Sequence, residues 1–296
     1  MTDRPLLSVG IPTYNRLAGL RTAVESVLAQ DYPSVEIVIC DNASTDGTEA
    51  YGREVAAAQA NVRYLRNATN LGPTANFNRA RSASAGDFLA WLGDDDWYGP
   101  GYLRACVDVL EARPDAALAT GRIVYEGDDG YLYDGVEVVC DELTGAERVA
   151  SYYRQVRDNG TFYGVARRAV VEGVPPKLNR MGNDWYLLAD EAFRGPILHV
   201  DGAVVHRRVG GATRSLRHVA TTFGFTRFEA EFPQLAIAGL AAREIAWHSP
   251  VFEPLGRGQR VVLALRCATI VTRRLVVPSV PKYVRQKAGR TPQANA

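Results

Sequence analysis

The sequence predicts an α/β fold built around a mostly parallel sheet. Short apolar runs alternate with amphipathic segments over roughly the first 130 residues, a pattern typical of βαβ units. Residues 35–40, VEIVIC, are apolar almost throughout, as expected of a strand that helices cover on both faces. The chain has 296 residues, 47% of them hydrophobic and 23% charged, which suits one large globular domain or two small ones.

The expected strands are short apolar runs, each ended by polar or turn residues. Pro12 ends the first run, and the acidic turn GDDD follows the fourth. Residues 126–153 are rich in Gly and Asp and predict no regular element, and Gly210-Gly211 ends the α/β pattern. We expect strands at residues 6–11, 35–40, 62–66, 88–92, 117–125, 162–167 and 197–207.

Helices are expected between these strands because apolar residues recur there at helical spacing. The second helix should begin near residue 45 or 46, since Asp46 and Glu49 have capping-box spacing. Pro73 suits the first turn of the third helix. We expect helices at 17–30, from 45–46, from 73, at 101–112 and at 184–194, with mostly helical structure at 216–248 and 260–277.

Composition excludes several classes of function. The formal net charge is +1, so the whole-chain charge gives no reason to expect nucleic-acid binding. No apolar run reaches the about 20 residues of a membrane-spanning helix, and the first residues lack the pattern of a secretory leader. The four cysteines are scattered without a CxxC pair, which fits a reducing cytosol and argues against a zinc module. We therefore expect a cytoplasmic protein.

The end of the chain departs from this balance of charge. Residues 254–296 contain seven Arg, two Lys and no acidic residue, a charge of +9, whereas the rest of the chain carries −8. We favour a terminal helical element packed on the acidic body, because Pro278 and Pro281 limit a long helix. The alternative is an interfacial helix on anionic lipid, which would place the protein peripherally at the inner face of the membrane.

Polar side chains follow three of the expected strands where each strand ends. Thr13 to Arg16 follow the first strand, Asp41-Asn42 the second, and Asp94 to Asp96 the fourth. Ligands bind at the carboxyl ends of the strands in open parallel sheets. We therefore expect an aromatic ring, a cation, an amide and up to four carboxylates at one ligand-binding edge.

Three consecutive carboxylates repel one another unless a cation joins them. A divalent ion is the natural partner, and oxygen-only ligands favour Mg²⁺ or Mn²⁺ over zinc. The alternative is a solvated turn that caps the following helix. Neither GxGxxG after the first strand nor GxxxxGK[ST] anywhere is present, so a metal ion would take the place of a glycine-rich phosphate loop.

Five segments in order resemble family 2 glycosyltransferases, which have the GT-A fold. They are SVGIPTYNR (8–16), EIVICDNASTDGT (36–48), NLGPTANFNRA (70–80), GDFLAWLGDDDWYGP (86–100) and GNDWYLLADEAFRG (182–195). The resemblance spans residues 6–211. Two departures are visible: Gly93 stands where the family often has Asp, and Asn76-Phe77-Asn78 replaces the common Ala-Arg-Asn, which removes an arginine that could face the diphosphate. The GDDD form resembles a subset of the family that handles deoxysugars.

The resemblance implies a site for a nucleotide sugar and a divalent metal. Tyr14 would stack on the nucleobase, and Asp41 would accept from an N–H of the base, which favours uracil or thymine. The other implied nucleotide-binding residues are Pro12, Thr13, Arg16 and Asp94, and the implied metal ligands are Asp95, Asp96 and His206. Each has a structural alternative: Tyr14 closing a turn, Asp41-Asn42 forming a turn, Arg16 as a surface charge and His206 as a structural histidine.

The resemblance also implies a catalytic residue on the acceptor side. Asp184 occupies the position of the general base of inverting enzymes, which removes the proton of the acceptor hydroxyl. The structural alternative is an N-cap for the helix that follows, and both can hold at once. Asp190 and Glu191 are weaker candidates because they lie about two turns further along the same helix.

These observations predict an inverting, metal-dependent glycosyltransferase that uses a UDP- or dTDP-sugar, with a saccharide, a lipid-linked sugar or a natural product as acceptor. Residues 1–125 would bind the nucleotide sugar, 126–215 the acceptor, and 216–296 would form a helical extension. A sugar-1-phosphate nucleotidyltransferase would need a Gly-rich basic loop that IPTYNR lacks, and a receiver-type domain is about half this length. A binding protein without transfer activity remains an alternative, and the oligomeric state is open.

Overall fold

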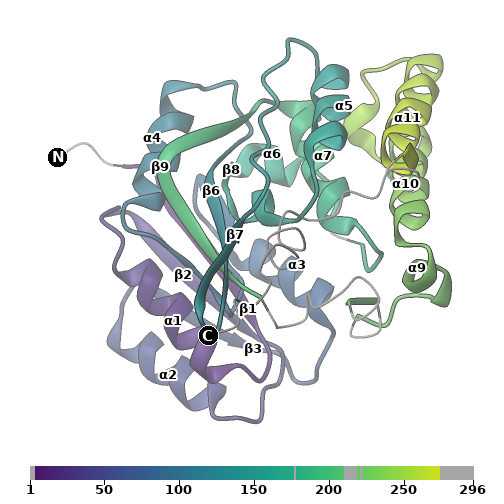
Figure 1. Cartoon of the computed structure of the whole chain (residues 1–296). Helices are drawn as coiled ribbons and strands as arrows, with labels where there is room; N and C mark the ends of the chain where they lie inside the picture. Colours follow the sequence, from purple (N-terminus) through teal and green to yellow (C-terminus); the bar gives the residue numbers. More distant parts are fainter. Residues whose placement is uncertain (1–3, 177, 210–218, 221–222, 274–296) are drawn as a thin grey trace, which may run out of the picture.

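The computed structural model describes residues 4–176, 178–209, 219–220 and 223–273, and it has the expected α/β architecture (Figure 1). Among these residues one nine-stranded sheet has the order β3-β2-β1-β4-β8-β6-β9-β5, and β7 pairs with β6. Helices flank this sheet, and a further helical layer lies beyond them (Figure 1). The predicted fold class, a mostly parallel central sheet flanked by helices, is therefore confirmed.

The first half of the sheet is parallel, and its strands end at the expected ligand-binding edge, called the ligand edge below. Its strands are β1 (Leu7–Thr13), β2 (Val35–Asp41), β3 (Val62–Arg66) and β4 (Phe88–Trp91). β1 lies between β2 and β4, so the strand order reverses there, which is the point where open sheets bind ligands. The register pairs Thr13 with Asp41, so the loops after β1 and β2 begin side by side.

The second half of the sheet is mixed. β6 (Leu118–Gly127) runs parallel to β9 (Ile197–Arg208), and β8 (Val165–Arg167) is antiparallel to both β4 and β6. The short strand β5 (Asp96–Tyr98) pairs antiparallel with β9, and β7 (Gly130–Asp134) forms a hairpin with β6. Neither β5 nor β7 was expected, because pairing with a distant strand leaves little local signal.

Helices α1 (Leu17–Leu28), α2 (Thr48–Ala58), α3 (Pro73–Ala83) and α4 (Tyr102–Ala112) form near the expected places. α3 packs on β1 and β2, and α4 packs on β6 and β9. The expected capping box of α2 is wrong: Gly47, with φ of 90°, is the N-cap, and Asp46 Oδ1 accepts instead from the backbone N–H of Thr48 at 3.2 Å.

Several later elements differ from expectation. The segment 126–153 was expected to be irregular but contains β7 and the start of α5 (Gly145–Gln155), which Thr144 caps by accepting from Glu147 N–H. The expected strand 162–167 is a 3-10 helix, Gly160–Tyr163, followed by β8. The short helix α6 (Arg168–Glu172) comes next, and α7 (Asn183–Arg194) matches its prediction closely.

The C-terminal layer consists of α9 (Arg227–Glu231), α10 (Pro233–Arg243) and α11 (Arg257–Thr272), with a π-helical turn at Glu244–His248 and a 3-10 turn at Pro250–Phe252. α10 packs on α11, and the pair lies against α5 and α7 on the side away from the sheet (Figure 1). The expected helices 216–248 and 260–277 are confirmed where the structure describes them. Gly210-Gly211, residues 216–218 and residues 274–277 lie outside the described residues. No helix among those described is long and apolar enough to cross a membrane.

One carboxyl group is buried where α7 meets the C-terminal layer. Asp190 has no exposed surface, and its Oδ2 accepts from Ser249 Oγ at 2.9 Å. Burial raises the pKa of Asp190 to about 8, and the hydrogen bond from Ser249 only partly opposes this. Asp190 therefore holds its proton in the folded protein at pH values where the unfolded chain would release it.

We predict that this proton makes stability depend on pH. Asp titrates near about 3.9 in an unfolded chain, so the folded state binds the proton more tightly. The contribution is fully present below about pH 4 and is lost as pH rises toward the folded value of about 8. Relative to Asp190→Asn, the wild-type protein should lose stability across this range in urea unfolding. A stability difference that does not change with pH would contradict the assignment.

Candidate functional site

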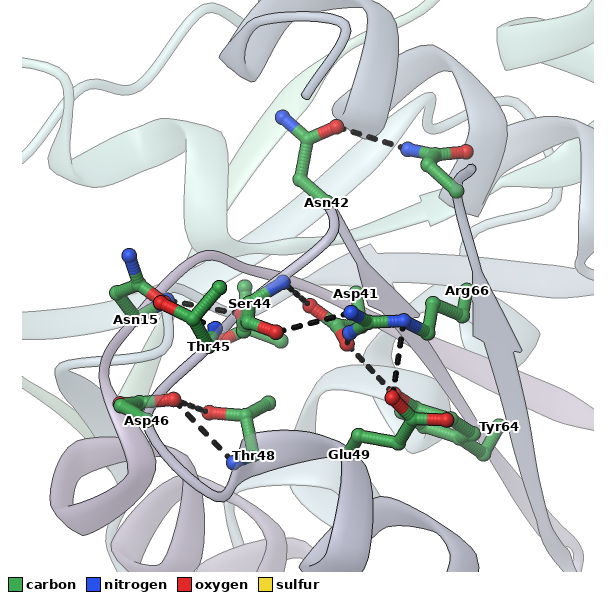
Figure 2. A network of polar contacts seen from close by, with 12 residues as sticks. Asn15, Asp41, Asn42, Ser44, Thr45, Asp46, Thr48, Glu49, Tyr64 and Arg66 are labelled. Carbon is green, nitrogen blue, oxygen red and sulfur yellow. Dashed lines mark hydrogen bonds and ion pairs between the residues drawn. The ribbon is translucent and has the colours of Figure 1, made fainter. Parts of the chain in front are cut away.

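The loops after β1 and β2 are joined to each other at the ligand edge (Figure 2). Asn15 N–H donates to Ser44 Oγ at 2.9 Å, and Asn15 Oδ1 accepts from the backbone N–H of Thr45 at 2.7 Å. Asn15 adopts φ of 52°, a left-handed conformation that asparagine tolerates better than most side chains. These bonds hold the backbone next to Tyr14, whose side chain is 44% exposed at the edge.

Asp41, at the end of β2, is fully buried in a network of donors (Figure 2). Its Oδ1 accepts from Ser44 N–H at 2.9 Å, and its Oδ2 accepts from the Tyr64 hydroxyl at 2.6 Å and from Arg66. Burial by itself raises the pKa of Asp41, but these hydrogen bonds together hold it below its ordinary value. A carboxylate has about four acceptor positions, so three are taken within the protein.

Arg66 and Tyr64 come from β3 and were not among the sequence-predicted site residues. Arg66 lies over Asp41 and also bonds Glu49, with Arg66 Nε 3.1 Å from Glu49 Oε2 (Figure 2). Tyr64 and Arg66 occupy alternate positions on β3, which lies at one side of the sheet. This spacing did not identify them as site residues, because polar residues at alternate positions of such a strand can simply face solvent. The structure thus adds a cation to the side of the edge where the nucleobase was expected.

A cluster of asparagines lies beside this network. Asn42 Nδ2 donates to Asn70 Oδ1 at 2.7 Å, and Asn67 Nδ2 donates to Asn42 Oδ1 at 2.9 Å and to Asn76 Oδ1 at 3.1 Å. Asn76 Nδ2 in turn donates to the carbonyl of Cys40 at 2.7 Å. The asparagines of the third motif therefore tie α3 to the end of β2, a role that their sequence spacing did not reveal.

The position of the missing family arginine is apolar in this protein. Phe77 packs edge-on against Phe162 with ring centroids 5.7 Å apart, and Phe162 stacks on Trp91 at 4.9 Å. Trp91 Nε1 donates to the carbonyl of Phe77 at 3.3 Å. An aromatic cluster therefore occupies the region where the family pattern would place a guanidinium, and Phe77 supplies no charge to a phosphate.

Asp94 and Asp95 follow β4 and face Arg16 at the start of α1. Arg16 bonds Asp95 directly, and Arg16 Nη1 lies 3.6 Å from Asp94 Oδ1. Asp94 Oδ2 accepts from the backbone N–H of Tyr14 at 3.3 Å. Burial and the neighbouring Asp95 raise the pKa of Asp94 to about 7, and Arg16 only partly opposes them. Two carboxyl groups thus share one guanidinium, and in the free protein a proton on Asp94 relieves part of their repulsion near neutral pH.

Asp96 points to the opposite side and is buried in β5. Its Oδ2 accepts from Arg207 Nε at 3.2 Å, and its Oδ1 accepts from the backbone N–H of Arg208 at 3.1 Å. Burial raises the pKa of Asp96, whereas Arg207 favours its charged form. These bonds argue against the expectation that Asp96 is a metal ligand. The guanidinium of Arg207 also donates to Tyr125, Tyr163 and Asn159, so its hydrogen bonds are made within the protein.

His206 on β9 lies in a separate polar cluster. Its Nδ1 is 2.6 Å from Glu126 Oε1, and its ring stacks on Trp97 with centroids 5.1 Å apart and planes 2° from parallel. Beside it lies an open groove of about 350 Å³, lined by strands β6 and β9, the start of α4 and Tyr131. The structure shows His206 engaged with Glu126 and Trp97, which favours the structural interpretation over metal binding.

Asp184 lies in the first turn of α7. The N-cap is Gly182, with φ of 80°, so the expectation that Asp184 might itself cap the helix is corrected. Asp184 Oδ1 accepts from the backbone N–H of Trp185 at 3.0 Å. Asp190 and Glu191, further along α7, are fully buried and cannot meet a substrate, in agreement with their lower rank.

The loop before α7 is anchored from three sides. Thr74 Oγ1, in the first turn of α3, donates to Asn179 Oδ1 at 3.0 Å. Glu229 Oε1, on α9, accepts from Arg180 Nε at 2.8 Å and from Met181 N–H at 3.0 Å. The first of these bonds joins the loop before α7 to the first turn of α3, which begins near the ligand edge.

The donor chemistry of Asp94 and Asp95 fits a hard divalent ion. No group of three or more His, Cys, Asp or Glu side chains forms a complete metal site in the parts of the chain that the structure describes. Mg²⁺ and Mn²⁺ need only one or two protein carboxylates when substrate phosphates fill other positions. Two adjacent carboxyl groups with one arginine between them therefore fit an ion held jointly with a diphosphate, which would replace the proton on Asp94.

Comparisons with known proteins indicate one family for this chain. The sequence profile of "Glycosyl transferase family 2" matches residues 8–172. A GalNAc(5)-diNAcBac-PP-undecaprenol beta-1,3-glucosyltransferase of Campylobacter jejuni is 25% identical over 169 residues, which cover 57% of this chain and 53% of that protein. Matches to other curated relatives cover from 30% to 58% of their lengths, so the chain spans only part of these proteins.

Two solved structures share the fold. The S. aureus TarS fragment 1–349 in complex with UDP-GlcNAc has a TM-score of 0.55 at 19% identity, covering 82% of this chain and 73% of that one. A mannosyltransferase from Pyrobaculum calidifontis in complex with GDP-Man and Mn²⁺ has a TM-score of 0.57 at 17% identity, covering 97% of this chain and 79% of that one. At these identities the likeness shows the GT-A fold and nothing finer.

We predict that Arg207→Met will destabilise the protein by about 3–5 kcal/mol, because it leaves the buried Asp96 carboxylate without its cation. The double variant Asp96→Asn with Arg207→Met should recover part of this loss, since the uncompensated charge is gone. Arg208→Met is the matched control on the exposed side of β9 and should cost well under about 1 kcal/mol. Urea unfolding checks all three. Equal effects of the two single variants would contradict the buried pair.

Proposed function

The chain belongs to glycosyl transferase family 2, and on that premise we propose that it transfers a sugar from a nucleoside diphosphate sugar to a hydroxyl acceptor. The observation that carries the proposal is the acidic pair Asp94–Asp95 on Arg16, at the edge where β1, β2 and β4 end. The pair lies beside the exposed ring of Tyr14, whose backbone N–H donates to Asp94. The following paragraphs assign a part of the donor or acceptor to each of these groups.

The nucleobase would lie over Tyr14, whose half-exposed ring offers a stacking surface next to the backbone of Pro12 and Thr13. Asp41 keeps one of about four acceptor positions for an imide N–H, which favours UDP or dTDP as the nucleotide. Arg66 covers Asp41 in the free protein. We therefore propose that Arg66 moves aside or donates to a carbonyl of the base when the nucleotide binds.

The diphosphate would lie at Asp94 and Asp95 with Mn²⁺ or Mg²⁺. Asp95 is the proposed direct ligand, with Asp94 beside it, because Asp96 and His206 are engaged elsewhere. A bound divalent ion would act as a Lewis acid on the departing diphosphate. Arg16 occupies the acidic pair in the free protein, and binding of a cation there would release its guanidinium toward a phosphate oxygen.

The transfer itself would invert the anomeric configuration. The acceptor oxygen attacks the anomeric carbon as the bond from that carbon to the diphosphate oxygen breaks, and the electron pair leaves with the diphosphate. Asp184 accepts the proton of the acceptor hydroxyl, so the oxygen of the new glycosidic bond is neutral in the product. The first turn of α7 carries this carboxylate. The attack proceeds through an oxocarbenium-like transition state, as in glycoside hydrolysis.

The donor sugar and acceptor are proposed only as classes. The GDDD turn resembles a subset of the family that handles deoxysugars, so we propose a deoxysugar as one class of donor. The acceptor would be a saccharide, a lipid-linked sugar or a natural product bound by residues 126–215. The relative from C. jejuni carries undecaprenol in the name of its substrate, which supports a lipid-linked acceptor.

We predict that calorimetric titration will detect binding of UDP or dTDP that depends on Mn²⁺. GDP should bind more weakly, because it lacks the imide arrangement that Asp41 would recognise. Asp95→Ala should abolish the dependence on metal, whereas Asp96→Asn should keep it, since Asp96 pairs with Arg207. Failure of every nucleotide to bind with or without Mn²⁺ would refute the donor site.

We predict that Asp184→Asn will lower turnover by roughly 10²–10⁴-fold while leaving donor binding unchanged, because the amide cannot accept the hydroxyl proton. Asp190→Asn is the matched control on the same helix, and its buried position should leave turnover within about twofold. The assay follows release of nucleoside diphosphate at saturating acceptor. Full turnover by Asp184→Asn would remove it from the catalytic role.

A further inference from the structure

Exposed apolar side chains are concentrated in the C-terminal layer. Twelve large hydrophobic residues are exposed among those that the structure describes, and seven of them fall between residues 228 and 265. Single exposed apolar residues are ordinary on a protein surface, but a concentration of them marks an interaction site. The seven residues are Phe228, Phe232, Leu235, Trp247, Val261, Val262 and Leu265.

These residues follow the outward sides of the helices. Phe232 and Leu235 are exposed near the start of α10, and Trp247 is 66% exposed three turns later. The rings of Phe228 and Phe232 lie 5.6 Å apart, so the stripe begins with an aromatic pair. α9 to α11 form the layer farthest from the sheet, so these side chains do not belong to the site described above (Figure 1).

The outward side of α11 combines apolar and basic residues. Val262 is 66% exposed and Leu265 63% exposed, while Leu263 and Cys267 face the core. α11 contains three arginines and no acidic residue, and Arg266 is exposed directly beside Leu265. Apolar side chains next to arginine, with a tryptophan nearby, are the composition of a surface that lies in the interface of a bilayer.

We propose that the outer face of α9–α11, defined by these seven apolar residues and the arginines of α11, docks on the surface of an anionic lipid bilayer. Charge selects this occupant: α11 carries Arg257, Arg260 and Arg266 and no acidic residue, which complements a negatively charged surface. A second copy of the chain would bring the same positive charge to this face and would be repelled.

The helices of this docking surface contact the loop that precedes α7 and Asp184. Ile237 of α10 lies so close to Gly182 that a Cβ there would come within 2.7 Å of Ile237 Cγ1. Glu229 of α9 accepts hydrogen bonds from Arg180 and from the backbone N–H of Met181. Burial by itself would raise the pKa of Glu229, but the hydrogen bonds to its carboxylate outweigh burial and lower the pKa to about 2. The layer that meets the bilayer would thus hold the start of α7, which brings Asp184 to an acceptor embedded in that bilayer.

We predict that the full chain sediments with vesicles of phosphatidylcholine and phosphatidylglycerol, and much less with phosphatidylcholine alone. The triple variant Trp247→Ser, Val262→Ser and Leu265→Ser should bind the anionic vesicles at least about tenfold more weakly, because three exposed apolar side chains no longer enter the interface. Arg266→Gln should weaken binding roughly fivefold, and added salt should reduce the difference.

The controls separate this surface from exposed residues elsewhere. Leu143 is 98% exposed before α5, and Leu143→Ser should leave vesicle binding unchanged. All variants should keep metal-dependent nucleotide binding, which tests the proposed function independently. Absence of sedimentation, unchanged binding of the triple variant, or a dimer in light scattering that the triple variant abolishes would each overturn the proposal. If the triple variant does not fold, Val262→Ser alone gives the same test.

Discussion

The ligand edge depends on which cations pair with the three consecutive carboxylates Asp94, Asp95 and Asp96. Asp94 and Asp95 meet Arg16 from the start of α1, whereas Asp96 turns inward to Arg207 on β9. Repulsion and burial would make any other arrangement costly, because each carboxylate would lose water without gaining a cation. The inward pair holds β5 on β9, and the two outward carboxyl groups share one guanidinium. A divalent cation with a diphosphate is the ligand that this arrangement suits.

The two sides of the edge are held in different ways. On the nucleotide side, short hydrogen-bonded loops and buried amides join β1, β2 and α3 directly, so the geometry is set by the sheet itself. On the acceptor side, Asp184 depends on a loop that α3, α9 and α10 hold from outside the sheet. The helical layer is therefore part of the support of the proposed base, and its attachment to another surface would reach the site mechanically.

The aromatic cluster of Phe77, Phe162 and Trp91 lowers the positive charge and the polarity of the candidate site. Replacing a cation by packed rings leaves Arg16 as the principal described cation beside the acidic pair, so a bound metal ion would carry more of the diphosphate charge. Phe77, in place of the arginine common in the family, also makes this part of the candidate site less polar. Both effects follow from one position in α3, where an apolar side chain packs on β4 and cannot approach a phosphate.

The sequence alone determined the parallel half of the sheet, because apolar runs such as 35–40 and helical stripes are local patterns that the structure reproduces. It also predicted that Tyr14, Asp41 and Asp94 would meet at one edge, since parallel strands end together. Only the tertiary structure decided what each carboxylate faces: Asp95 lies in the turn before β5 and meets Arg16, whereas Asp96 begins β5 and meets Arg207 on β9. Partners that come from distant strands, such as Arg66 over Asp41 and Glu126 beside His206, leave no local pattern, so pairing and burial decided them.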